Sequence, residues 1–96
     1  MSQNSVVESQ VNLDVKFFAS LREQVGTAEL HLSAVSLETL LKELEAHLSK
    51  AGFEHLLSPN IRMAVNQDLV EGNWREAGLV FADGDEVAFL PPVTGG

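Results

Sequence analysis

The last six residues of the chain, Pro91-Pro92-Val93-Thr94-Gly95-Gly96, are the segment whose residue types could do chemistry. Proline fixes an extended backbone and has no amide proton, so Pro91 and Pro92 end the preceding strand and hold the following residues clear of the sheet. Gly95 and Gly96 have no side chains, so they can enter a channel too narrow for any Cβ atom. The sequence therefore predicts an extended tail, residues 91–96, that presents the α-carboxylate of Gly96 to a partner.

A free carboxylate at the end of such a tail has a specific reactivity. It can attack the α-phosphate of ATP, become an acyl-adenylate and then accept a sulfur or an amine nucleophile. The partner supplies the positioning and the electrostatic stabilisation for that step, so the chain is not expected to be catalytic alone. The competing interpretation is an inert, frayed Gly-Gly end, which the preceding Pro-Pro pair disfavours.

Other reactive sites are not expected. The chain has no cysteine, which excludes disulfides, thiolate zinc sites, iron–sulfur clusters and a cysteine nucleophile. His31, His47 and His55 are predicted on a strand, at a helix end and in a loop, without a nearby carboxylate set, so neither a metal site nor a bound cofactor is predicted. The run Asp83-Gly84-Asp85-Glu86 lacks the ligand spacing of a calcium loop and indicates a turn with exposed acids.

The length and charge of the chain limit its partners. Its 96 residues allow one domain, and 14 acidic against 6 basic residues give a net charge of −8. Few basic residues disfavour nucleic acid, whereas the acidic balance suits a basic partner. The first ten residues do not resemble a signal peptide, and no apolar run approaches the roughly 20 residues of a membrane span. We therefore expect a cytoplasmic protein that does not contact membranes, with a disordered arm at 1–10 and a domain at 11–90.

Hydrophobic periodicity indicates the elements that hold the tail. Alternating apolar and polar residues predict strands at 11–17, 29–32, 61–66, 69–70 and 86–90, with a turn at Gln67-Asp68. A long helix is predicted to begin after Ser36 and to end at Gly52, on an apolar stripe of Leu37, Leu40, Leu41, Leu44 and Leu48. A short helix at 21–25 is predicted to start with a Ser20–Glu23 capping box and stop at Gly26. Residues 53–60 are predicted to form a loop that can include one helical turn.

Strands on both sides of one long helix predict a mixed four- to five-stranded sheet packed on that helix. This is an α+β fold of the β-grasp type, as in ubiquitin. A ferredoxin-like arrangement is disfavoured because it would need a second long helix.

Three apolar residues are predicted to be exposed: Phe18 and Leu90 are out of phase with their strands, and Leu69 is at the turn of a short strand. If they converge near the root of the tail, they form a docking patch, with Arg22 as its polar contact. The alternative is that sheet curvature or the short helix covers them.

Three sequence blocks now resemble the small, sulfur-carrier subunits of molybdopterin synthase. The blocks are Lys16-Phe17-Phe18-Ala19 with Arg22-Glu23 and Gly26-Thr27, then Ala64-Val65-Asn66-Gln67 with Leu69-Val70, and finally the whole stretch from Asp83 to Gly96. The resemblance spans residues 11–96, and its last block is the most specific. It implies a ubiquitin-like β-grasp protein.

The resemblance also implies a function and partners. An E1-like enzyme would use ATP to adenylate Gly96, and a sulfur donor protein would supply the sulfur of a thiocarboxylate. The tail would enter the large synthase subunit and convert cyclic pyranopterin monophosphate to molybdopterin, within a heterotetramer that has two small subunits at its ends. Partner contacts are implied for Phe18, Arg22, Leu69, Leu90 and the tail residues Pro91, Pro92, Val93 and Thr94, with Gly95 and Gly96 at the reacting end.

Two alternatives remain open from the sequence. One is a related carrier that serves another pathway, such as thiamine synthesis, or is conjugated to protein lysines. The other is a β-grasp interaction module with an inert tail.

Overall fold

The computed structural model describes residues 11–91. The predicted arm at 1–10 and the tail residues 92–96 lie outside this range. In chain order the elements are β1 (Asn12–Phe17), α1 (Ser20–Val25), β2 (Glu29–Ser33), α2 (Leu37–His47), α3 (Lys50–Leu56), β3 (Arg62–Val65), β4 (Asp68–Leu69), the 3-10 helix η2 (Trp74–Glu76) and β5 (Glu86–Leu90).

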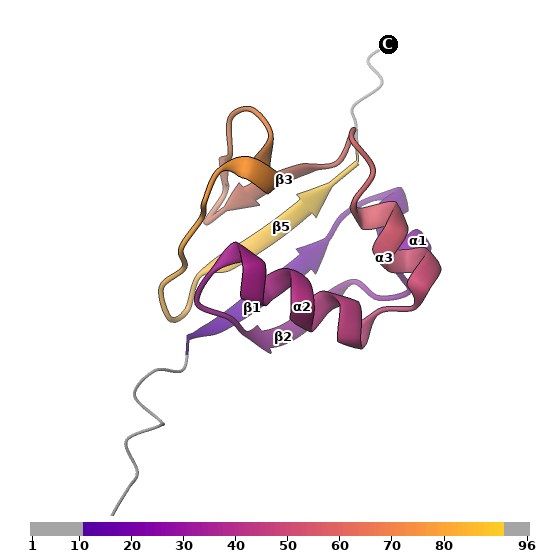
Figure 1. Ribbon diagram of the computed structural model, residues 1–96. Helices are drawn as coiled ribbons and strands as arrows, with labels where there is room; N and C mark the ends of the chain where they lie inside the picture. The colour runs from indigo at the N-terminus through magenta and orange to yellow at the C-terminus, as the bar shows by residue number, and fades with distance from the viewer. Residues whose placement is uncertain (1–10, 92–96) are drawn as a thin grey trace, which may run out of the picture.

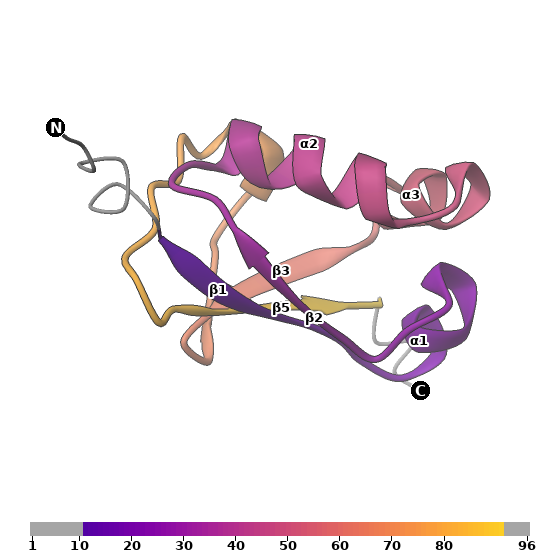
Figure 2. The same ribbon diagram turned by 90° about the horizontal axis from the view of Figure 1, so that it is seen from below.

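The five strands form one mixed sheet in the order β2-β1-β5-β3-β4. β1 and β5 come from opposite ends of the described chain and pair in parallel at the centre of the sheet (Figure 1). The other pairs of neighbouring strands are antiparallel. Figure 2 shows α2 and α3 over one face of the sheet, with α1 at its end. The other, open face carries no helix of the described residues. This arrangement confirms the predicted mixed sheet of an α+β, β-grasp fold.

The core lies between the sheet and α2. Alternate residues of β1 and β5 point into it, and the rings of Phe17 and Phe89 stack with centroids 5.7 Å apart. Leu40 and Leu44 of α2 are fully buried against this layer, as the predicted apolar stripe requires. Trp74 of η2 packs its indole edge-on against Phe89 at 5.4 Å and donates from Nε1 to the carbonyl of Ile61 at 2.8 Å. The segment around Trp74 is therefore part of the core.

The helical region differs from the prediction of one long helix. α2 ends at His47, because the backbone of Leu48, its C-cap, is extended. Ser49 is the N-cap of α3, and its side chain accepts a hydrogen bond from the Gly52 amide at 3.0 Å. Gly52 therefore lies inside α3 and does not end a helix, and the predicted loop 53–60 begins as helix. A Cβ atom at Gly52 would lie 3.0 Å from the Val25 Cα of α1, so this glycine permits the close packing of α1 against α3.

The start of α1 also differs from the prediction. Ser20 is the first residue of the helix, and the N-cap is Ala19, which makes no side-chain capping bond, so the Ser20–Glu23 capping box is wrong. Ala19 has φ 53° and ψ −136°, a conformation in which the Cβ of an L-residue is crowded. The helix ends at Gly26 in the left-handed conformation, as predicted.

Replacing Ala19 by glycine is expected to stabilise the protein. Relief of the strained backbone is worth about 1–3 kcal/mol, whereas the added flexibility of glycine costs about 0.5–1 kcal/mol. The Ala19 methyl group is exposed, so little packing is lost. Thermal unfolding should show a melting temperature several degrees higher. Ala28→Gly, at an exposed position without positive φ, is the matched control and should lower the melting temperature. A lower melting temperature for Ala19→Gly would show that the backbone of Ala19 is not strained.

The turn between β3 and β4 is displaced by one residue from the predicted position. Asn66 and Gln67 occupy it with φ of 51° and 74°, the paired positive values of a type I′ hairpin turn. The predicted return strand at Leu69-Val70 is therefore β4 at Asp68–Leu69. The displacement keeps Ala64 opposite Leu69.

Candidate functional site

The root of the tail emerges from the centre of the sheet. β5 ends at Leu90, and Pro91 lines an open hollow of about 500 Å³ together with residues of α1, α3 and the segment before β3: Ala19, Ser20, Gln24, His55, Ser58, Asn60 and Ile61. The remaining tail positions with predicted roles, Pro92, Val93, Thr94, Gly95 and Gly96, lie outside the described residues, so those roles stay predictions.

The open face of the sheet carries the predicted apolar patch. Phe18 directly follows β1 and donates its amide to the Phe89 carbonyl at 3.1 Å, which places it beside the end of β5. Leu90, on β5, lies opposite Arg62 of β3, and Leu69 lies opposite Ala64. Phe18 and Leu69 are 42% and 55% exposed, far more than the buried core positions. We call Phe18, Leu69 and Leu90 the open-face patch.

Two small residues lie beside Leu69 on the same face of the sheet. Ala64 and Ala88 are paired across β3 and β5, and Leu69 follows in the same cross-strand row. Side chains of one row point to the same face, and this row continues from Ala88 to Lys16 of β1. Ala64 and Ala88 are only 7% and 6% exposed, so they separate Leu69 from the centre of the sheet and add little surface. These two alanines were not predicted as part of the site. Their position next to the core residues Met63 and Phe89 in the alternating pattern could have placed them on the open face.

The other two predicted contact residues differ from Phe18 and Leu69. Leu90 is only half-buried and not freely exposed, because it lies on an interior strand between β1 and β3. Arg22 is exposed on α1, four residues after Phe18, and takes part in none of the ion pairs found among residues 11–91. Its predicted contact with a partner stays a prediction.

Residues of the resembling blocks also fix the strands structurally. The Asn66 side chain donates to Asp85 Oδ1 at 2.9 Å and accepts from the Glu86 amide at 2.9 Å. Asp85 Oδ2 accepts from the Ala82 amide at 2.8 Å. These bonds hold the β3–β4 turn against the start of β5. The Ala82 amide first, and then the Asn66 side chain, lower the pKa of Asp85 below 3.8 because both donate to its ionised form.

The acidic turn is therefore expected to stabilise the protein in a pH-dependent way. A folded-state pKa below the unfolded one contributes stability above about pH 4, and that contribution is lost as pH falls through the folded pKa. Asp85→Asn should lower the free energy of unfolding by about 1 kcal/mol at pH 7. This difference in unfolding free energy between the variant and the wild type should become smaller below about pH 4. Urea unfolding at several pH values measures this difference. Asp68→Asn, at an exposed position, is the control, and its difference in unfolding free energy from the wild type should not depend on pH in this way. If the difference for Asp85→Asn were the same at pH 7 and pH 3, the lowered pKa of Asp85 would be contradicted.

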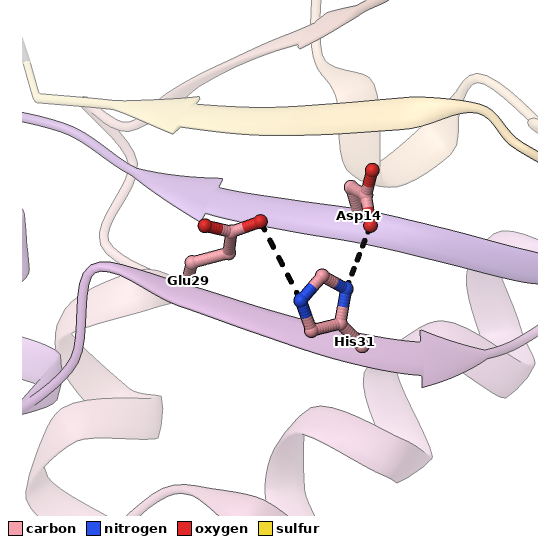
Figure 3. Close-up of side chains that lie close together, drawn as sticks. All are labelled: Asp14, Glu29 and His31. Carbon is pink, nitrogen blue, oxygen red and sulfur yellow. Dashed lines mark hydrogen bonds and ion pairs between the residues drawn. The ribbon is translucent and has the colours of Figure 1, made fainter.

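The described residues offer surfaces more than reactive groups. The residues buried in the described part of the chain include no polar or charged side chain, which leaves no enclosed acid, base or nucleophile there. One expectation needs correction: His31 does have a carboxylate set beside it, since Asp14 and Glu29 both approach its ring (Figure 3). Strand register brings these three residues together, and the register could not be read from the sequence.

Among the described residues, no helix has the length and hydrophobicity needed to cross a membrane.

Comparison with known proteins gives concordant results. The ThiS family matches residues 15–96. The molybdopterin synthase sulfur carrier subunit of Escherichia coli strain K12 is 38% identical over 86 residues, covering 88% of this chain and 99% of that protein.

Solved structures share the fold. The small archaeal modifier protein 1 of Methanosarcina acetivorans superposes with a TM-score of 0.70 at 26% identity, over 91% of this chain and 98% of that one. A chain in the complex of subunits 1 and 2 of the molybdopterin-converting factor from Helicobacter pylori 26695 superposes with a TM-score of 0.66 at 26% identity, over 90% and 100%. The chain therefore belongs to the ThiS family, as a relative of the molybdopterin synthase sulfur carrier subunits.

Proposed function

We propose that this protein is the sulfur carrier subunit of a molybdopterin synthase. The observation that carries the proposal is the match to the Escherichia coli carrier over 99% of that protein's length, together with a family match that runs through Gly96. The position of Pro91, at the end of a central strand and beside the open-face patch, supports it, because a partner bound there would lie next to the root of the tail.

The proposed chemistry takes place at Gly96. Its carboxylate oxygen attacks the α-phosphate of ATP on an E1-like enzyme, and pyrophosphate leaves. A sulfide-level sulfur nucleophile supplied by a donor protein then attacks the acyl carbon of the adenylate, the bond to AMP breaks, AMP leaves, and the carboxylate has become a thiocarboxylate. In the large subunit this sulfur passes to cyclic pyranopterin monophosphate, and the carboxylate is regenerated with an oxygen from water. The carrier holds no cofactor in this scheme, and the cytoplasm is the expected compartment.

The test is an intact-mass measurement of the full chain produced together with its activating enzyme. The expected product has one oxygen replaced by sulfur on the C-terminal peptide, and the chain without Gly96 should lack it. A carboxylate-only product under sulfur-replete conditions would contradict the proposal. A lysine-linked conjugate of Gly96 would instead favour the modifier alternative, which the likeness to an archaeal modifier protein keeps in view.

The proposed partner is the large subunit, in a heterotetramer that contains two carriers. The Helicobacter pylori structure is a complex of two such subunits, which supports a partner of this kind. The open-face patch supplies exposed apolar area next to the tail, and Arg22 supplies a cation at its margin. Apolar anchors of this type carry much of the binding energy of an interface.

Charged substitutions in the patch are therefore expected to weaken the complex. Phe18→Asp or Leu69→Asp should each lower the affinity for the large subunit by roughly 30-fold or more, since an anchor residue contributes about 2 kcal/mol. Titration calorimetry measures this, with circular dichroism as the check of folding. Val80→Asp is the matched control, because Val80 is 74% exposed outside the patch. Equal losses at Val80 and Phe18 would show that the patch is not the interface.

A further inference from the structure

The side chains of Asp14, Glu29 and His31 gather on the open face, on the neighbouring strands β1 and β2 (Figure 3). Asp14 lies directly opposite His31 in the strand register, and Glu29 precedes His31 by two residues on the same face of β2. One ligand atom from each lies within 4.8 Å of the other two. We propose that this cluster binds a divalent metal ion of the zinc class between Nε2 of His31 and the carboxylate of Glu29.

The contact with Asp14 orients the imidazole for this role. Nδ1 of His31 lies 2.7 Å from Asp14 Oδ1. An ionised carboxylate can only accept a hydrogen bond, so Nδ1 carries the proton, and in the neutral ring Nε2 presents its lone pair. A carboxylate that holds the far nitrogen in this way is the usual support of a metal-binding imidazole. Asp14 is thus a positioning residue and not a ligand.

The spacing on the other side of the ring fits an ion. Nε2 of His31 lies 3.6 Å from Glu29 Oε2, which is too long for a hydrogen bond. Zinc–nitrogen and zinc–oxygen bonds of about 2.0–2.2 Å, meeting at a near-tetrahedral angle, place their two ligand atoms about 3.3–3.6 Å apart. An ion can therefore bridge the two atoms without movement of either strand. Water would fill the remaining positions, because all three residues are exposed.

The local charge and the donor types select the ion. Two carboxylates flank one imidazole, and the nearest lysine, Lys16, lies opposite Glu29 but contacts Glu86 at 3.8 Å. Lys16 therefore does not occupy the carboxylate of Glu29, which faces His31. An imidazole nitrogen with a carboxylate oxygen favours zinc and similar transition metals over magnesium, which prefers oxygen ligands alone. The site uses no residue of the tail or the open-face patch, so it stands apart from the proposed sulfur transfer.

Titration of the untagged full chain with ZnCl2, followed by calorimetry and by nitrogen NMR of the histidine rings, tests the proposal. We expect saturable binding of one ion, a shift of the His31 Nε2 resonance with Nδ1 still protonated, and no response to MgCl2. His31→Gln should abolish the binding, and Glu29→Gln and Asp14→Asn should each weaken it by about tenfold or more.

Two variants serve as matched controls. His47→Gln removes a histidine whose Nδ1 contacts the Glu43 carbonyl, and Glu38→Gln removes an equal charge from the exposed side of α2, away from Lys16. Both should bind zinc as the wild type does. The proposed site would be overturned if the wild type bound no more zinc than His31→Gln. It would also be overturned if His47→Gln lost zinc binding to the same extent, or if the metal shifted the Nδ1 resonance of His31.

Discussion

Deletion of Gly96 is expected to abolish sulfur transfer while the folded domain stays intact. The proposed reaction occurs on the carboxylate of this residue, and its removal draws the carboxylate back by about 3.3–3.6 Å along an extended chain. A misplacement of about 1 Å already costs about 100-fold in rate when two groups must meet in a fixed geometry. The loss should therefore exceed 100-fold.

The measurement is the conversion of cyclic pyranopterin monophosphate by the reconstituted complex. Addition of one residue after Gly96 should have an equal effect, because it displaces the carboxylate forward by the same length. Gly96→Ala keeps the carboxylate in place and tests whether the channel admits a Cβ atom. The melting temperature should not change in any of these variants. Conversion that survives the deletion would contradict the mechanism.

Trp74→Ala is expected to produce the largest loss of stability. Trp74 is 1% exposed, packs against Phe89, and carries the guanidinium of Arg75 4.4 Å from its ring centroid. Truncation of a buried aromatic residue costs about 3–5 kcal/mol, a large part of the roughly 5–15 kcal/mol that holds a domain folded. It also leaves the Ile61 carbonyl without its donor.

Urea unfolding followed by circular dichroism measures this loss, because the substitution removes the chain's one tryptophan as a fluorescent probe. Trp74→Phe is the control: it keeps an aromatic ring beside Phe89 but removes the indole donor, so it should cost clearly less. A loss below about 1 kcal/mol for Trp74→Ala would mean that the segment around η2 is not part of the cooperative core.

β1 and β2 could be predicted because each has one solvent-exposed face. Alternation in β1 and at Glu29–Ser33 marks the buried positions whichever strand pairs with which. The break between α2 and α3 could not be found in this way, since Leu48 continues the apolar stripe while Ser49 offers the competing cap. Gly52 was misjudged because close approach of another helix, and not a chain reversal, requires it.

The candidate site was predictable to a different extent. The tail, the out-of-phase Phe18 and the turn position of Leu69 are visible in the sequence, because each is a local signal. The contact of His31 with Asp14 depends on which residues face each other across two strands, and a shift of one residue would move them to opposite faces. The bonds between Asn66 and Asp85 depend in the same way on the pairing of β3 with β5.

The central place of β5 has a mechanical consequence. β5 is hydrogen-bonded on one side to β1 and on the other to β3. A pull on the chain beyond Pro91 acts along β5, so it loads both ladders in shear and must break their bonds together. A pull on an edge strand such as β4 would instead open its bonds one after another. This arrangement resists tension applied at the end of β5, a property that suits the proposed insertion of the tail into a partner and its withdrawal.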